Sequence, residues 1–142
     1  MKKIALVLLC TLMPALAFSQ LPPQQVNAAV KAAGGAKPFI KEMVRQSAEK
    51  FPMMINKNVE VRSVASNGLQ MTYMNRLINV EKKDVYDLDA LKKANVNYFA
   101  CSSPVLGILI KDYDAEIIYM ATARGTEFLF QYNLNRSTCR GK

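Results

Sequence analysis

The chain has 142 residues, which is enough for one domain and too few for two of ordinary size. With 51% hydrophobic and 21% charged residues it is neither disordered nor fibrous, and its formal net charge is +8. It contains no histidine, which excludes histidine-based acid–base catalysis, Ser-His and Cys-His nucleophile pairs, and histidine-ligated metal sites.

The first residues predict a secretory signal peptide. A basic pair, Lys2-Lys3, precedes an apolar run over residues 4–12, and residues 15–17 (Ala-Leu-Ala) supply the small-x-small pattern of a signal-peptidase site. The apolar run is too short for a stable membrane-spanning helix. We therefore expect residues 1–19 to be a signal peptide, residues 20–142 to form a single domain, and the protein to be periplasmic or secreted.

Cys10 lies inside the apolar run, where lipid attachment would need a small residue directly before it. Leu9 is too bulky for such a lipobox, so we expect export without a lipid anchor and no stable membrane attachment. Removal of Lys2 and Lys3 lowers the net charge from +8 to +6. The remaining basic residues are scattered, which does not indicate a nucleic-acid-binding surface. Most of these basic residues are expected to lie on solvated faces of the protein. The alternative is that they attract an acidic partner or an anionic envelope surface.

Two cysteines remain in the mature chain, Cys101 and Cys139. An even number of cysteines in an oxidising compartment predicts a disulfide, and with two cysteines only one pairing exists. A metal site is the alternative, but the long spacing and the absence of histidine do not favour it. The closed loop would stabilise the fold by about 3–4 kcal/mol.

Two helices are predicted at the start of the mature chain. Residues 24–33 are rich in alanine and are followed by Gly34-Gly35, which ends a helix. Pro38 begins a second helix, whose apolar residues recur at helical spacing until Phe51-Pro52 stops it. An amphipathic helix must cover another surface, and we expect that surface to be a sheet.

Two hairpins with a helical stretch between them complete the chain. Residues 59–66 and 69–78 flank Asn67-Gly68, and residues 115–123 and 126–134 flank Arg124-Gly125. Between the hairpins, residues 87–99 and 105–112 have helical patterns, with Asp87 and Ser103 as N-caps. We therefore expect an α+β domain in which about four helices flank an antiparallel sheet of about four strands, with one disulfide.

Two patterns that could carry chemistry are weak. Asp112, Asp114 and Glu116 alternate as in a calcium loop, but the glycine and the final glutamate that an EF-hand needs are absent. Ser47 and Lys50 have the spacing of a Ser-x-x-Lys motif, but they lie at a helix end on its solvated side. We therefore expect no catalytic residue, no metal and no cofactor.

The second hairpin and the helix before it are more apolar than a single core face requires. The last strand is apolar on both faces, and residues 105–110 are nearly all apolar. Either all of these residues pack in the hydrophobic core, or some of them form an exposed apolar surface that a partner binds. We predict a partner-binding groove between that helix and the last hairpin, with Leu106, Ile110 and Leu129 among its walls.

A sparse pattern spans the two cysteines. It consists of Cys101-Ser102-Ser103-Pro104, a helical Leu-Ile run, a strand with Tyr119, a turn with Gly125, an aromatic strand and Ser137-Thr138-Cys139. This pattern resembles the pilotin-like small exported proteins of Gram-negative bacteria. These include the disulfide-bonded pilotins of type II secretion and related proteins labelled quorum-sensing-regulated virulence factors. The similarity extends over roughly residues 39–139.

The resemblance implies a helix-flanked antiparallel sheet and a protein-binding function, and it transfers no catalytic residue. Type II pilotins are lipoproteins whose lipid carries a bound secretin subunit to the outer membrane, whereas this chain lacks a lipobox. We therefore expect a non-enzymatic exported module that binds another protein, such as a secretion component, in secretion or virulence. The alternative is a periplasmic immunity protein or enzyme inhibitor, whose partner would be a toxin or enzyme.

Overall fold

The computed structural model describes residues 22–142, so the predicted signal peptide and Cys10 lie outside the described residues. The helices are α2 (Pro23–Ala33), α3 (Ala36–Ala48), α4 (Leu88–Asn95), the single turn α5 (Phe99–Ser102) and α6 (Pro104–Tyr113), with a 3-10 turn η2 (Lys82–Asp84). The strands are β1 (Met53–Asn56), β2 (Val59–Asn67), β3 (Gln70–Leu77), β4 (Glu116–Thr122) and β5 (Phe128–Leu134). In the described part of the chain, no helix is long and apolar enough to cross a membrane.

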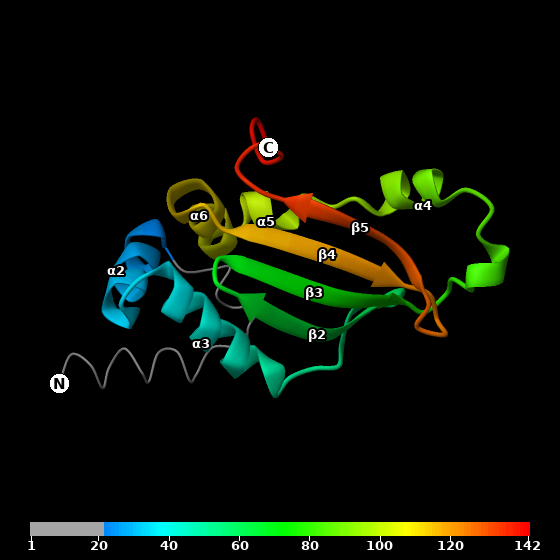
Figure 1. The fold of residues 1–142 in the computed structure, drawn as a ribbon, viewed down its shortest axis with the longest axis horizontal. Helices are drawn as coiled ribbons and strands as arrows, with labels where there is room; N and C mark the ends of the chain where they lie inside the picture. The colour runs from blue at the N-terminus through cyan, green and yellow to red at the C-terminus, as the bar shows by residue number, and fades with distance from the viewer. Residues whose placement is uncertain (1–21) are drawn as a thin grey trace.

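The predicted α+β class and both hairpins are confirmed, and the sheet differs in two details. It has five strands in the order β1-β2-β3-β4-β5. Figure 1 labels β2 to β5, which lie side by side in this order. The additional strand, β1, has only four residues directly after Pro52, which is too short for a recognisable alternation. The inner strands β3 and β4 pair in parallel, so the sheet is mixed. The helices between them provide the long crossover that parallel neighbours require.

The first hairpin turns one residue later than the Asn-Gly pair indicates. Asn67 pairs with Gln70, which leaves Gly68 and Leu69 as the two turn residues. Gly68 has a φ of +62°. A type II′ turn places glycine at this first central position, because a side chain there would be strained. The turn therefore uses the glycine that the sequence indicated, in a different register.

Local capping residues end and begin the helices as the sequence predicts. Gly34 closes α2 in the left-handed region with a φ of +94°. Asp87 accepts a hydrogen bond from the backbone N–H of Ala90 at 3.0 Å, at the start of α4. The predicted helix over residues 87–99 is divided, since α4 ends at Asn95 and Phe99 begins α5.

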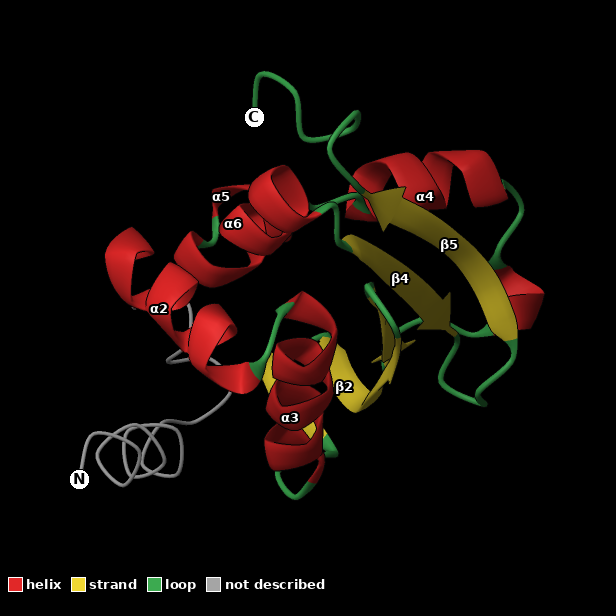
Figure 2. Ribbon diagram, turned by 60° about the vertical axis from the view of Figure 1, so that its left-hand side comes forward, coloured by secondary structure: helices red, strands yellow, loops and turns green. Residues whose placement is uncertain are grey.

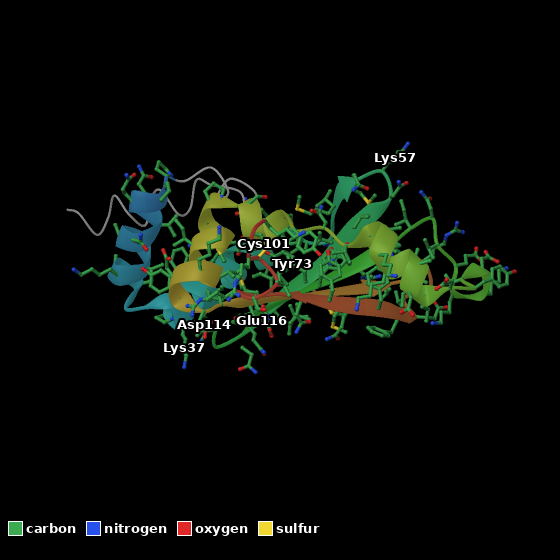
Figure 3. The ribbon with its side chains drawn as sticks, turned by 90° about the horizontal axis from the view of Figure 1, so that it is seen from above. Lys37, Lys57, Tyr73, Cys101, Asp114 and Glu116 are labelled. Atoms are coloured by element: carbon green, nitrogen blue, oxygen red, sulfur yellow. A yellow bond between two sulfur atoms is a disulfide. The ribbon has the colours of Figure 1, made fainter. Side chains whose placement is uncertain are left out.

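The helices cover one face of the sheet, and the strands form the opposite side of the molecule (Figures 2 and 3). Alternate residues on the covered face, such as Met71, Ile117 and Leu134, are buried. Their neighbours Thr72 and Ile118 point to the other face and are half-buried. Helix α2 packs against α3 and α6 at one end of the molecule, and α4 packs against β5. The core therefore lies in the single layer between sheet and helices.

Candidate binding groove

A groove of about 920 Å³ opens on the covered face of the sheet, where the helices leave part of it bare. Met43 and Val44 of α3 line it on one side, and Ala94 of α4 and Leu106 of α6 also line it. The short strand β1 contributes Met53 and Ile55. Figure 3 shows the end of the β1–β2 hairpin, marked by Lys57, on the same side of the sheet as the helices. The groove is therefore built by segments from α3 to β4, between residues 43 and 119.

No residue that lines the groove carries a charge, although 21% of the chain is charged. The lining is made of aliphatic, methionine and aromatic side chains together with a few neutral polar groups such as Asn75 and Asn97. Ile55 has 46% of its surface exposed, so apolar area is open to solvent in the free protein. A large apolar concavity with a small number of polar groups is the usual form of a site for a ligand or for a segment of a partner.

Two tyrosines lie side by side on the floor of the groove. Tyr73 on β3 is the cross-strand partner of Tyr119 on β4, and both line the groove. The Tyr119 ring stacks on Tyr132 with centroids 4.7 Å apart, and the Tyr73 ring meets the edge of Phe99 at 5.8 Å. These contacts fix both rings in place.

Burial keeps the floor tyrosines protonated. It raises the pKa of Tyr73 and that of Tyr119 to about 12. Among residues 22–142, neither hydroxyl has a hydrogen-bond partner, whereas the Tyr132 hydroxyl accepts from the backbone N–H of Asn97 at 3.2 Å. The floor therefore offers two neutral hydroxyl groups that are free to donate.

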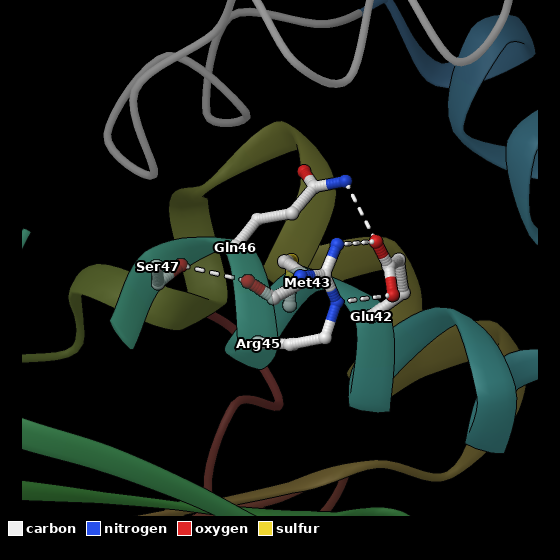
Figure 4. A network of polar contacts seen from close by, with 5 residues as sticks. All are labelled: Glu42, Met43, Arg45, Gln46 and Ser47. Atoms are coloured by element: carbon white, nitrogen blue, oxygen red, sulfur yellow. Dashed lines mark hydrogen bonds and ion pairs between the residues drawn. The ribbon is translucent and has the colours of Figure 1, made fainter. Parts of the chain in front are cut away.

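The α3 wall carries a polar network on its outer side (Figure 4). Arg45 donates to both carboxylate oxygens of Glu42, at 2.6 and 2.9 Å, and this contact holds the pKa of Glu42 below its usual value. The prediction that Ser47 lies on the solvated side of the helix is wrong, because its side chain is buried. It donates to the backbone carbonyl of Met43 at 2.8 Å, an ordinary bond for a serine inside a helix. Lys50 is exposed beyond the helix end. Ser47 and Lys50 therefore do not form a nucleophile–base pair, although they have the Ser-x-x-Lys spacing.

The disulfide predicted from the sequence is present and supports the opposite wall. Cys101 in α5 is bonded to Cys139 in the C-terminal turn, and both cysteines are buried. Gly107 of α6 lies against the carbonyl of Cys101 so closely that an added Cβ would lie 3.0 Å from its oxygen. The bond therefore fixes the α5–α6 segment, whose residues Phe99 and Leu106 line the groove.

The structure separates the three residues that we predicted as groove walls. Leu106 is half-buried and lines the groove. Ile110 has no exposed surface and Leu129 has 3%, because both pack in the layer between sheet and helices. Ile110 and Leu129 are therefore core residues in the free protein, and a partner-binding role for Leu106 stays a prediction.

Residues earlier in the chain were not identified from the sequence, although they supply much of the groove. Tyr73 and Asn75 belong to the alternation of the predicted strand over residues 69–78, which marks their common face. That alternation does not reveal whether a helix covers the face. Met53 and Met54, beside Pro52, were open to two interpretations from the sequence, core filling or a surface patch for a partner. Ile55 gave no signal, because its strand has four residues.

A second hollow, of about 520 Å³, lies beside the acidic residues of the weak calcium pattern. Both carboxylate oxygens of Glu116 accept hydrogen bonds, from Gln70 at 3.1 Å and from Asn135 at 3.3 Å. Asp114 faces Arg136 at 3.8 Å. Within residues 22–142 no cluster of three or more acidic, cysteine or histidine side chains could hold a metal ion. These carboxylates are therefore engaged by protein groups.

No protein-family model matches this sequence, and no curated protein matches it significantly. Three solved structures match the fold with probability 1.00. A protein from Pseudomonas aeruginosa that is proposed to be secreted has a TM-score of 0.60 and 13% identity, over 74% of this chain and 93% of its own.

The other two similar structures are pilotins. The pilotin EpsS of the type 2 secretion system of Vibrio vulnificus has a TM-score of 0.59 and 8% identity, over 75% of this chain and 94% of its own. The type II secretion system pilotin AspS of Vibrio cholerae has a TM-score of 0.56 and 8% identity, over 73% and 92%. The resemblance to pilotin-like proteins thus holds at the level of the fold.

Proposed function

We propose that this protein is an exported, non-enzymatic module that binds a segment of another protein in its uncharged groove and serves as an accessory protein in secretion. The observation that carries the proposal is the groove itself, an apolar concavity of about 920 Å³ without a charged lining residue. The fold shared with two type II secretion pilotins and with a protein proposed to be secreted supports the choice of process.

A binding role also agrees with the side chains available. The sequence has no histidine to act as a base, and the groove has no carboxylate or lysine in its lining. A nucleophile in the groove would therefore have no partner to activate it. The floor hydroxyls, held protonated by burial, act as hydrogen-bond donors.

Export is supported by the signal-peptide pattern and by the disulfide. We expect the mature protein to begin between Phe18 and Leu21 and to carry no lipid. Mass spectrometry of the protein purified from its native bacterium measures both properties. A diacylated Cys10 as the first residue would contradict this expectation and would favour a lipid-anchored pilotin role.

A matched pair of variants tests whether the groove binds a partner. Met54 and Ile55 are neighbours in β1 and each is 46% exposed, but only Ile55 lines the groove. Ile55→Glu should place a charge in the groove and abolish association, whereas Met54→Glu should leave it intact. Both side chains are accessible to water, so both variants should fold, which circular dichroism checks.

The measurement is cross-linking in the native periplasm, followed by purification and identification of the partner by mass spectrometry. We expect one partner to be retained by wild type and Met54→Glu and lost by Ile55→Glu. A partner retained equally by all three proteins would place binding outside the groove. A secretion component supports the proposed process, whereas a toxin or enzyme supports the immunity or inhibitor role instead.

A further inference from the structure

Among the charged residues next to groove-lining residues in the chain, the acids are paired with arginines, whereas three lysines form no ion pair within residues 22–142. Acidic residues directly adjacent in the chain to groove-lining residues are Glu42 and Glu60. Each is paired with an arginine, Glu42 with Arg45 at 2.6 Å and Glu60 with Arg76 at 3.3 Å. These two acids therefore contribute little negative charge to the groove.

Three lysines beside the groove remain without such a partner. Lys50 precedes groove-lining Phe51, Lys57 follows Asn56, and Lys93 precedes Ala94. All three are exposed, and none forms an ion pair within residues 22–142. They come from three different elements, the end of α3, the β1–β2 turn and α4. In each of these three elements an exposed positive charge therefore lies one residue along the chain from the uncharged lining.

The floor adds a second requirement. The hydroxyls of Tyr73 and Tyr119 have no hydrogen-bond partner in the described part of the chain, and water satisfies them in the free protein. A purely apolar ligand would expel that water and leave buried donors unpaired, which is unfavourable. A ligand with an acceptor over the floor restores the hydrogen bonds.

We propose that the groove selects an apolar protein segment that carries a hydrogen-bond acceptor over the tyrosine floor and carboxylates on its flanks. This proposal rests on the proposed function, since it specifies the chemistry of the segment bound in the same groove. The apolar contacts supply binding free energy, the floor distinguishes between apolar sequences, and the lysines favour acidic partners.

Peptide selection tests the proposal even while the natural partner is unidentified. The probe is a displayed library of random peptides selected on the full mature protein, with removal of every peptide that also binds Ile55→Glu. The expected outcome is enrichment of apolar peptides with flanking Asp or Glu and a central Ser, Thr, Asn or Gln. Groove-dependent peptides that are neutral or basic would overturn the proposal and leave the proposed function standing. If no enriched peptide depends on Ile55, the groove function itself fails.

Charge reversal then measures the contribution of the lysines. The triple variant Lys50→Glu, Lys57→Glu, Lys93→Glu should bind the enriched acidic peptide about tenfold more weakly at low salt. The matched control reverses Lys31, Lys37 and Lys111, which are exposed, do not line the groove, and change the net charge equally. The difference between the two variants should shrink in high salt because ions screen exposed charges. Equal weakening by both variants would contradict a local role for the three lysines.

Removing each tyrosine hydroxyl measures how much it contributes to peptide binding. Tyr73→Phe and Tyr119→Phe keep the rings and their stacking, and each should weaken the peptide with a central acceptor by about three- to tenfold. The same peptide with leucine at the central position should bind both variants at least as well as it binds wild type. If the two peptides respond alike to the loss of either hydroxyl, the floor does not select for an acceptor.

Discussion

At the residue scale, the floor tyrosines make stability depend on alkaline pH. Burial raises the pKa of Tyr73 and Tyr119 from 10.0 to about 12. Between these pH values the unfolded chain has lost the protons that the folded chain still holds, so the free energy of unfolding falls as pH rises. Urea titrations at several pH values should show a shallower fall for Tyr119→Phe than for wild type. Tyr86→Phe is the control, since Tyr86 is 96% exposed, and an equal slope in both variants would contradict the assignment.

Ile110 distinguishes a core residue from a groove residue. Its side chain has no exposed surface, so Ile110→Ala should lower the free energy of unfolding by about 2–5 kcal/mol through lost burial and a residual cavity. Leu88→Ala is the comparison, because Leu88 is 39% exposed and its truncation should cost much less. Urea unfolding measures both. An Ile110→Ala protein of wild-type stability that no longer binds its partner would restore Ile110 to the binding surface.

At the scale of single elements, the start of α6 depends on one hydroxyl. Ser103 accepts a hydrogen bond from the backbone N–H of Leu106 at 3.3 Å, and Pro104 occupies the first turn. Ser103→Ala should lower the free energy of unfolding by about 1 kcal/mol because that N–H loses its partner. Denaturant unfolding measures the change.

Ser102→Ala provides the control for this cap. Ser102 is exposed, lies one residue earlier and is not the N-cap of α6. Its replacement should leave the free energy of unfolding within about 0.5 kcal/mol of wild type. An equal loss in the two variants would indicate that the Ser103 hydroxyl does not act as a cap.

At the scale of the whole molecule, the disulfide joins the α5 turn to the C-terminus across a separation of 38 residues. Closing a loop of this length should stabilise the fold by about 3–4 kcal/mol, a large part of the stability of a small domain. Thermal unfolding with and without a reductant should therefore show a markedly lower Tm after reduction. The double variant Cys101→Ser, Cys139→Ser should melt near the reduced protein and show no response to reductant. Unchanged melting of the reduced protein would assign its stability to packing alone.

The sequence determined the features that depend on neighbouring residues. The caps at Gly34, Asp87 and Ser103, both hairpins and the alternation of their strands follow from contacts within a few positions. The disulfide also followed, because two cysteines allow one pairing. The four-residue strand β1 did not, since it is too short to show a period.

Tertiary structure alone decided how these elements combine. Gln70 and Glu116 are 46 positions apart, and nothing local requires β3 and β4 to pair in parallel. The apolar run over residues 105–110 was equally compatible with core and with surface. Leu106 and Ile110 are four positions apart on the same face of α6. Packing nevertheless buried Ile110 completely and left Leu106 half-buried beside the groove, at the other end of that face. The groove exists only where α3 and the α4–α6 segment leave the sheet bare, which no local pattern encodes.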